Sequence, residues 1–391
     1  MSATSAHQLL VIGGGPAALA AVRAYRDAGG PGRVALICDE RRLPYRRPVL
    51  SKELLRGELN EADIDLVSAS ELAAAAVELI PGRGVSLDPD AHSVALAGGR
   101  ELTYARCLIA TGAKPTRLPV PGAHDASVHT LRSLQDMREL HSRLPRGGEV
   151  VVIGSGFIGC EIAASLRALG HPVRLCSQEV APNTDRLGPA AAARLRSWLL
   201  DAGVELRLGA AVRGIRRDGE RLEVQTSAGV TTGDVVVMAT GVAPRSELAA
   251  LAGLELEGGA IPADAQMATA LPDVFAAGDV ALAVNTTVGR RVRVEHWGDA
   301  IAQGDVAGRA AAGRTAQWAG VPGFWSEVVG HTLKFAGWSE GFDEVRFEPT
   351  HGVGFAAWYR RADRIVGVLT HQRDDAYTQG CELIAAGGSW R

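Results

Sequence analysis

The sequence contains two copies of a glycine-rich turn that follows an apolar strand and opens a helix. The first copy is LLVIGGGPAALA at residues 9–20, and the second is VVVIGSGFIGCEIAA at residues 150–164. This pattern is typical of dinucleotide-binding Rossmann units, because its glycines let a pyrophosphate approach the N-terminus of the helix. One copy is weak evidence, since glycine-rich turns are common in α/β proteins. Two copies in one chain predict two bound dinucleotides with a redox reaction between them.

The candidate binding residues are the glycines of the two turns and the residues that open the first helix. They are Gly13, Gly15, Pro16 and Ala17 for the first nucleotide and Gly154, Gly156 and Gly159 for the second. The next apolar strand, residues 34–38, ends at Asp39 and Glu40, where a carboxylate accepts hydrogen bonds from an adenosine ribose. Either of these two residues fits that role, and an ordinary solvated acidic loop is the alternative.

The composition is that of a globular protein with more than one domain. The chain has 391 residues, of which 47% are hydrophobic and 22% are charged, with a formal net charge of −3. This charge does not favour nucleic acid or an anionic membrane as the main partner. The sequence has no apolar run of about 20 residues, as a membrane span requires, and no basic segment at the start, so we expect a cytoplasmic protein.

The five cysteines are scattered and indicate buried small side chains. They form neither a C-x-x-C motif nor a metal-ligand spacing, so we expect no metal site. The missing C-x-x-C argues against enzymes that relay electrons from a flavin through a redox dithiol.

The segment LPYRRPVLSK, at residues 43–52, resembles the signature of the flavoprotein reductases that feed ferredoxins and rubredoxins, including the reductase components of ring-hydroxylating dioxygenases. Further segments in the same order extend the resemblance from residue 8 to about residue 370. They are IATGA (109–113), the second glycine turn, MATGV (238–242), VFAAGDV (274–280), VEHW (294–297) and VPGFWS (321–326).

The resemblance implies FAD as the first nucleotide and assigns three residues to the reaction. Lys52 and Glu161 are implied to meet beside the flavin, where a buried cation needs an anion and a positive charge favours the anionic reduced flavin. Trp297 is implied to lie close to the isoalloxazine. A tryptophan at a helix edge is more often part of the core, and that reading is the alternative.

The resemblance also implies further FAD contacts. Arg47 would flank the pyrophosphate or ribityl chain, and Asp279 would accept hydrogen bonds from the ribityl hydroxyls. Asp279 precedes an apolar segment that looks helical, so it could also cap a helix. Thr111 and Gly112 end a strand in small residues, which lets the chain leave one domain near a cofactor.

The second nucleotide site departs from the family pattern. The strand at residues 173–176 should end in a glutamate that binds the NADH ribose, but Ser177 stands there. NADPH would usually require an adjacent arginine, and Arg174 or Arg186 could reach the site only if the loop folds back. Glu179 could supply the carboxylate two residues later. NADH is slightly favoured, and NADPH stays open. In the third domain Glu327 and Val328 replace the last two residues of the family's WSDQ run.

We therefore predict an α/β protein with two Rossmann-type domains and a small α+β C-terminal domain. The FAD domain is discontinuous (1–120 and 243–320), the NAD(P)H domain is inserted (121–242), and the C-terminal domain spans 321–391. The resemblance implies that this last domain covers the flavin and supplies a surface for a partner or for a homodimer.

The predicted function is an FAD-dependent oxidoreductase that passes electrons from NADH or NADPH to a ferredoxin or rubredoxin serving an oxygenase. The protein then needs no acid–base dyad or metal, because the cofactor carries the chemistry. One alternative is a flavoenzyme that acts directly on a small molecule, and another is a non-catalytic FAD-binding redox sensor. A basic patch would favour the acidic carrier, with candidates Arg41, Arg42, Arg46, Arg290, Arg291 and Arg293.

Overall fold

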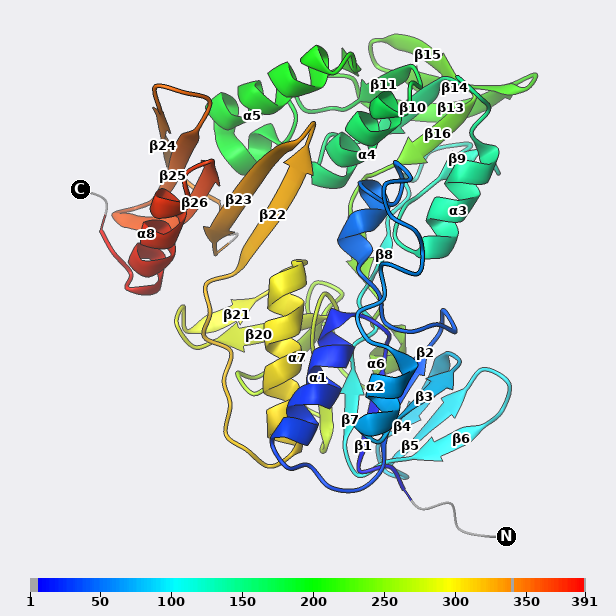
Figure 1. The fold of residues 1–391 in the computed structure, drawn as a ribbon, viewed down its shortest axis with the longest axis vertical. Coiled ribbons are helices and arrows are strands. Elements are labelled where there is room, and N and C mark those ends of the chain that lie inside the picture. Colours follow the sequence, from blue (N-terminus) through cyan, green and yellow to red (C-terminus); the bar gives the residue numbers. More distant parts are fainter. Residues whose placement is uncertain (1–5, 339–340, 390–391) are drawn as a thin grey trace. The chain divides into compact units, whose positions relative to one another are not determined.

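The computed structural model describes residues 6–338 and 341–389, and its chain divides into two compact units (Figure 1). Unit 1 comprises residues 6–46, 65–114 and 243–324, and unit 2 comprises residues 47–64, 115–242 and 325–389. Two of the passages between the units follow residues 114 and 242. The first lies in the proline-rich segment KPTRLPVPG. The four-part domain division expected from the sequence stays a prediction.

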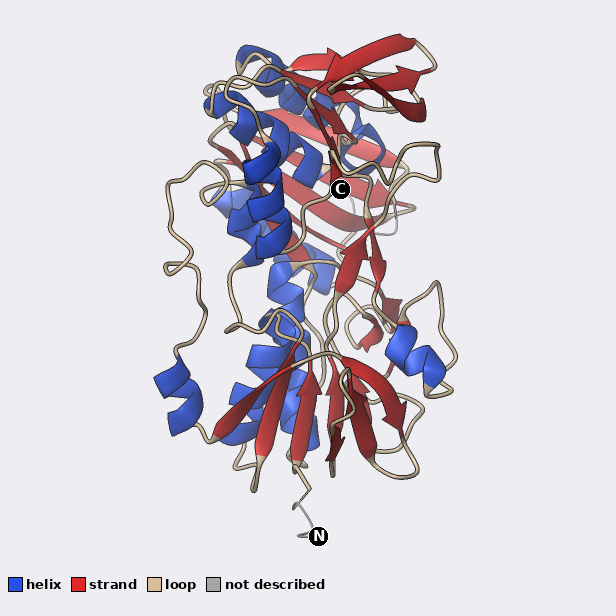
Figure 2. Ribbon diagram, turned by 90° about the vertical axis from the view of Figure 1, so that its right-hand side faces the viewer, coloured by secondary structure: helices blue, strands red, loops and turns tan. Residues whose placement is uncertain are grey.

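Unit 1 is built on a five-stranded parallel sheet of order β19-β7-β1-β2-β3, whose strands lie side by side near the N-terminus (Figure 2). Every residue of its central strands is buried, which explains their continuous apolar sequences. The strands are β1 (Leu9–Ile12), β2 (Val34–Cys38), β3 (Val77–Pro81), β7 (Cys107–Ile109) and β19 (Val274–Ala276).

Two helices, α1 (Pro16–Asp27) and α7 (Trp297–Ala311), run side by side against one face of this sheet (Figure 1). Their close approach depends on glycine. A Cβ built on Gly304 would lie 2.2 Å from the carbonyl oxygen of Ala17, and one on Gly308 would lie 2.2 Å from that of Ala21. Residues far apart in the sequence therefore meet at the start of α1.

The other face of the sheet is covered by α6 and the three-stranded sheet β4-β5-β6. A further three-stranded sheet, β18-β20-β21, contains the segment after Asp279. The helix expected there is wrong, because residues 281–285 form strand β20; a short apolar run cannot distinguish helix from strand. The remaining elements of unit 1, with the two strands at the passages after residues 114 and 242, are α2 (Ala69–Ala74), β4 (Gly84–Asp88), β5 (Ser93–Leu96), β6 (Glu101–Thr103), β8 (Ala113–Pro115), β17 (Val242–Pro244), α6 (Glu247–Leu251), β18 (Ile261–Ala263), β20 (Ala281–Asn285) and β21 (Arg290–Val292).

Unit 2 contains a second parallel sheet, of order β12-β11-β10-β16-β9, with the same strand–glycine–helix arrangement. An antiparallel sheet, β13-β14-β15, covers part of it. The elements are η1 (Arg47–Ser51), β9 (Val128–His129), α3 (Leu134–Arg143), β10 (Val150–Ile153), α4 (Phe157–Ala168), β11 (Val173–Cys176), α5 (Thr184–Asp201), β12 (Glu205–Arg207), β13 (Val212–Asp218), β14 (Arg221–Thr226), β15 (Gly229–Gly233) and β16 (Val235–Met238).

The last part of the chain forms a five-stranded sheet of order β22-β23-β26-β25-β24, in which the β23–β26, β26–β25 and β25–β24 pairs are antiparallel, with one helix. Its helix packs closely on the sheet, since a Cβ on Gly380 would lie 2.3 Å from the Val368 side chain. This architecture confirms the predicted α+β character of the C-terminal region. The elements are β22 (Gly323–Val328), β23 (His331–Gly337), β24 (Glu344–Pro349), β25 (Phe355–Arg361), β26 (Arg364–His371) and α8 (Asp374–Ala385).

Candidate functional site

The first glycine turn of unit 1 has the geometry of a phosphate-binding loop. Gly13 has φ +139°, and a Cβ on it would lie 2.1 Å from the carbonyl oxygen of Ala110. Gly15 caps α1 and has no atom within 4 Å of its Cβ position, so the space before the helix is open. Pro16 starts the helix, and neither an acidic residue in its first turn nor a side-chain cap competes for its N–H groups. These free donors suit a pyrophosphate.

The end of β2 presents both acidic candidates for the adenosine ribose. Asp39 and Glu40 are exposed, and Glu40 accepts a hydrogen bond of 2.6 Å from the hydroxyl of the buried Tyr45. This contact orients Glu40. The choice between the two carboxylates stays a prediction.

A buried glutamine, Gln303 of α7, lies beside the predicted ribityl-binding residue Asp279. Its Oε1 accepts a hydrogen bond of 2.9 Å from the backbone N–H of Gly278, and its side chain is fully buried. Its Nε2 has no hydrogen-bond partner in the part of the chain that the structure describes. An unpaired buried donor is costly, so this amide fits a site that a polar cofactor completes. Reasoning from the sequence missed this residue, although a polar side chain among alanines and glycines was a signal.

Trp297 is the first residue of α7 and is partly buried. The preceding His296 has its Nδ1 3.1 Å from a carboxylate oxygen of Asp299, which also accepts a hydrogen bond from the backbone N–H of Gly323. These contacts fix the start of the helix. The assignment of Trp297 to the flavin stays a prediction.

The two ATG segments, at residues 110–112 and 239–241, make the same kind of hydrogen bond, each within its own unit. In unit 1 the Thr111 hydroxyl donates to the carbonyl oxygen of Arg245 at 2.6 Å, and Gly112 accepts a bond from the Arg245 N–H. In unit 2 the Thr240 hydroxyl donates to the carbonyl oxygen of Thr116 at 2.6 Å. Each threonine therefore ties together two segments that adjoin the passages between the units.

The second glycine turn, in unit 2, reproduces the first. Gly154 has φ +105°, and a Cβ on it would lie 2.3 Å from the carbonyl oxygen of Ala239. A Cβ on Gly159 would lie 2.1 Å from the carbonyl oxygen of Gly154, so α4 packs directly on the turn. Gly156 caps α4 and faces open space. This turn is a second site suited to a pyrophosphate.

Ser177, at the end of β11, is buried, and its hydroxyl lies 2.7 Å from that of Ser155. Ser155 also donates to the carboxylate of Glu179 at 2.8 Å. The structure therefore brings together the residue expected at the ribose and the carboxylate that follows it.

Lys52 and Glu161 form a buried ion pair within unit 2, as the predicted pairing requires. Their side chains are 7% and 3% exposed, and Lys52 Nζ lies 3.0 Å from Glu161 Oε2. The same oxygen accepts a bond of 2.5 Å from the Ser51 hydroxyl, and Oε1 accepts one of 2.7 Å from Ser326. Ser326, which belongs to β22, and Ser51 were not assigned from the sequence. The three donors satisfy a carboxylate that would be costly to bury alone.

The predicted arginines are mostly engaged within their own units. Arg47 donates to the carbonyl oxygen of Arg132 at 3.0 Å, in unit 2. In the proposed basic patch of unit 1, Arg42 pairs with Asp65, and Arg291 and Arg293 pair with glutamates. These pairs reduce the net positive charge that the patch can offer to an acidic partner.

The cysteines do not form a redox pair. Four of them are buried, and Cys381 is partly buried. Burial raises the pKa of Cys107 and Cys160, and it raises the pKa of Cys176 to about 11. In the described part of the chain, histidine, cysteine and acidic side chains do not gather into a group that could hold a metal ion.

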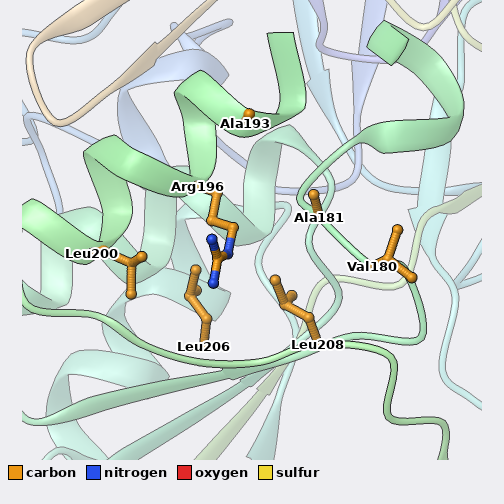
Figure 3. A pocket seen from close by; sticks show the side chains of 7 residues that line it. All are labelled: Val180, Ala181, Ala193, Arg196, Leu200, Leu206 and Leu208. Carbon is orange, nitrogen blue, oxygen red and sulfur yellow. The ribbon is translucent and has the colours of Figure 1, made fainter. Parts of the chain in front are cut away.

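A shallow groove of about 510 Å³ lies in unit 2, beside the loop that follows Glu179 (Figure 3). Arg196 projects from α5 toward two leucines from the region of β12. The lining residues are Val180, Ala181, Ala193, Arg196, Leu200, Leu206 and Leu208.

Two protein-family models match the chain. One, described as pyridine nucleotide-disulphide oxidoreductase, matches residues 7–304, and the other, described as reductase C-terminal, matches residues 323–391. Members of the first family use FAD and NAD(P)H, in agreement with the two glycine turns.

Known proteins similar to this chain include oxygenase reductases. The chlorobenzene dioxygenase ferredoxin reductase component of Cupriavidus sp. is 33% identical over 97% of this chain and 93% of its own length. Apoptosis-inducing factor 3 of Homo sapiens is 31% identical over 99% of this chain, which spans 64% of that relative. The covalent putidaredoxin reductase–putidaredoxin complex contains a chain with a TM-score of 0.91 and 28% identity, covering 98% of this chain and 94% of that one.

The fold and the cofactor types expected from the sequence are confirmed by these matches. Among the described residues, helices long and apolar enough to cross a membrane are absent.

Proposed function

Because the chain belongs to the pyridine nucleotide-disulphide oxidoreductase family, we propose that it passes electrons from NAD(P)H through FAD to an iron–sulfur carrier protein that feeds an oxygenase. The observation that carries this proposal is a pair of glycine turns, each with a geometry suited to a pyrophosphate, in a chain without a C-x-x-C dithiol. Electrons then leave the flavin without a cysteine relay. The names of the reductase relatives and the putidaredoxin complex support a ferredoxin-type acceptor.

The residues of the two turns would hold the cofactors. The N–H groups at the start of α1 would bind the FAD pyrophosphate, with Asp39 or Glu40 on the ribose and Asp279 with Gln303 toward the ribityl side. When bound, FAD supplies the change from two-electron to one-electron transfer.

The nicotinamide dinucleotide would bind at the start of α4, where Gly154 and Gly156 leave room for its pyrophosphate. Glu161 keeps the ammonium of Lys52 paired in a buried position. The positive charge of Lys52 is proposed to stabilise the negative charge that the flavin would carry when reduced. Trp297 is proposed to contact the flavin edge, and Arg47, Thr111 and Gly112 to contribute further contacts.

The proposal is tested by anaerobic titration of the purified protein with NADH and NADPH, following the loss of the flavin absorption band. We expect bleaching by at least one nucleotide. The variant Gly156→Val should keep its FAD but lose bleaching, because its side chain would fill open space before α4 without touching the fold. Gly320→Val, also at an open position, is the matched control. A yellow protein that neither nucleotide reduces would refute the proposal.

The acceptor is identified by cytochrome c reduction with an added ferredoxin or an added rubredoxin. We expect turnover to depend on an iron–sulfur carrier. Equal turnover without a carrier would favour direct reduction of a small molecule instead. Sedimentation of the holoenzyme tests whether the C-terminal domain forms a homodimer, as the family resemblance allows.

A further inference from the structure

We propose that Glu179 selects the nicotinamide cofactor: its carboxylate binds the adenosine ribose in place of the strand-end glutamate and rejects a 2′-phosphate, so that the protein uses NADH. This inference rests on the proposed function, because it concerns the nucleotide that donates the electrons. The residue at the strand end, Ser177, has no negative charge and cannot reject a 2′-phosphate, so the inference assigns this rejection to Glu179.

The strand register places the second glycine turn beside the end of β11. Strands β10 and β11 are parallel with Ile153 opposite Cys176, and the N–H of Gly154 donates to the carbonyl oxygen of Cys176 at 2.8 Å. Ser155 and Ser177 therefore lie at the same edge of the sheet. In dinucleotide-binding folds this edge receives the adenosine ribose.

Glu179 is held at this edge rather than turned into solvent. Its Oε2 accepts hydrogen bonds from the Ser155 hydroxyl at 2.8 Å and from the backbone N–H of Asn183 at 2.9 Å. Its own N–H donates to the Ser177 hydroxyl at 3.2 Å. The loop thus folds back, and the carboxylate of Glu179, two residues after the strand-end position 177, reaches the glycine turn.

Asn183 stabilises this loop conformation. It adopts a left-handed backbone with φ +57°, and its side-chain amide donates to the carbonyl oxygen of Ser155 at 3.1 Å. Among the described residues, both donors to the Glu179 carboxylate use Oε2, which leaves Oε1 to accept a bond from a ribose hydroxyl. A ribose offers that hydroxyl, whereas a 2′-phosphate carries a charge of about −1.5 to −2 and repels the carboxylate.

Nearby arginines are poorly placed to reverse this preference. Arg174 and Arg207 both pair with Glu205. Arg196 points toward the leucines of the groove described above (Figure 3). Arg186 is exposed in the first turn of α5, and the variant Arg186→Ala measures its effect.

The test compares ADP-ribose with 2′-phospho-ADP-ribose binding to the oxidised holoenzyme by calorimetry. These probes report on the ribose site without any redox step. We expect the wild-type protein to bind ADP-ribose at least about 30-fold more tightly, as a juxtaposition of like charges implies. Glu179→Gln should reduce this ratio at least about tenfold, mainly by improving binding of the phosphorylated probe.

Three further variants make the result specific. Ser155→Ala should lower the ratio less than Glu179→Gln, since it removes one of the two bonds that position the carboxylate. Glu220→Gln, an exposed glutamate in the turn between β13 and β14, removes the same charge from unit 2 and should leave the ratio unchanged. Arg186→Ala should leave the ratio at or above its wild-type value.

The outcomes separate this inference from the proposed function. A ratio that Glu179→Gln leaves unchanged, or a wild-type protein that prefers the phosphorylated probe or binds neither, overturns the role of Glu179. Normal probe selectivity without flavin reduction by either nucleotide would refute the electron-transfer proposal and leave the ribose site in place.

Discussion

Replacing Lys52 by methionine should destabilise unit 2 strongly, because the substitution leaves the carboxylate of Glu161 buried without its counter-charge. The two side chains are 7% and 3% exposed, and their charged atoms are 3.0 Å apart. Removing one partner of such a pair typically costs about 3–5 kcal/mol. The hydroxyls of Ser51 and Ser326 still donate to the carboxylate, so we expect about 3 kcal/mol.

The reverse substitution, Glu161→Gln, should cost at least as much. It leaves a buried ammonium and replaces one accepting oxygen by an NH₂ group that cannot accept a bond from a serine. The double variant removes both charges together, so its loss should fall short of the sum of the single losses. We expect a coupling energy of about 2–3 kcal/mol for Lys52 and Glu161.

The assay is urea denaturation of the full chain, with amide hydrogen exchange of α4 as the local readout. The matched control is Lys334→Met, which breaks the exposed pair with Asp374, whose N–O distance is 2.7 Å. An exposed pair should contribute less than about 1 kcal/mol. If Lys52→Met costs no more than this control, or if the coupling energy is close to zero, the argument from burial is wrong.

Three other features outside this pair can be probed by substitution. Gln303→Leu should weaken FAD binding about tenfold, because it removes the buried Nε2 donor that has no partner within the described residues and leaves the Gly278 N–H without its acceptor. Flavin fluorescence during dilution measures the loss, and unchanged affinity contradicts the assignment. Gly154→Ala should cost more than about 2 kcal/mol through its positive φ and its clash with a carbonyl oxygen, whereas alanine at the open Gly156 should cost little in thermal unfolding. Burial and the neighbouring His371 lower the pKa of His331 below its usual value. Below the usual histidine pKa the unfolded chain therefore binds more protons than the folded one, and the free energy of unfolding falls as the pH drops from about 7.5 to about 5.5. His331→Gln should lessen the difference in melting temperature between these two pH values.

The parallel strands could be predicted to within about a residue, because strands buried on both faces are continuous apolar runs. The predicted strands at residues 34–38 and 173–176 are β2 and β11 themselves. The β13–β14–β15 sheet was missed, since a sequence such as VRGIRRD carries too many charges for a buried run.

The site could be predicted only where a motif fixes the backbone. The two glycine turns and the Lys52–Glu161 pair follow from local patterns and from a family resemblance. The contact between Ser326 and Glu161 depends on how distant segments pack, and the loop that carries Glu179 depends on the left-handed Asn183. The sequence offered Glu179 as a candidate carboxylate, but neither its loop conformation nor the Ser326 contact has a signature in the order of the residues.

The hydrogen bonds of Glu161 also bear on how the chain folds. They join segments separated by 110, 109 and 165 positions in the sequence, and the longest one reaches into the last sheet of the chain. Contacts of such separation form late, because the loop-closure entropy must be overcome first. During synthesis, therefore, Oε1 of Glu161 can gain its serine donor only after the C-terminal sheet has emerged. A chain shortened before that sheet would keep the ion pair but lose the contact that completes it.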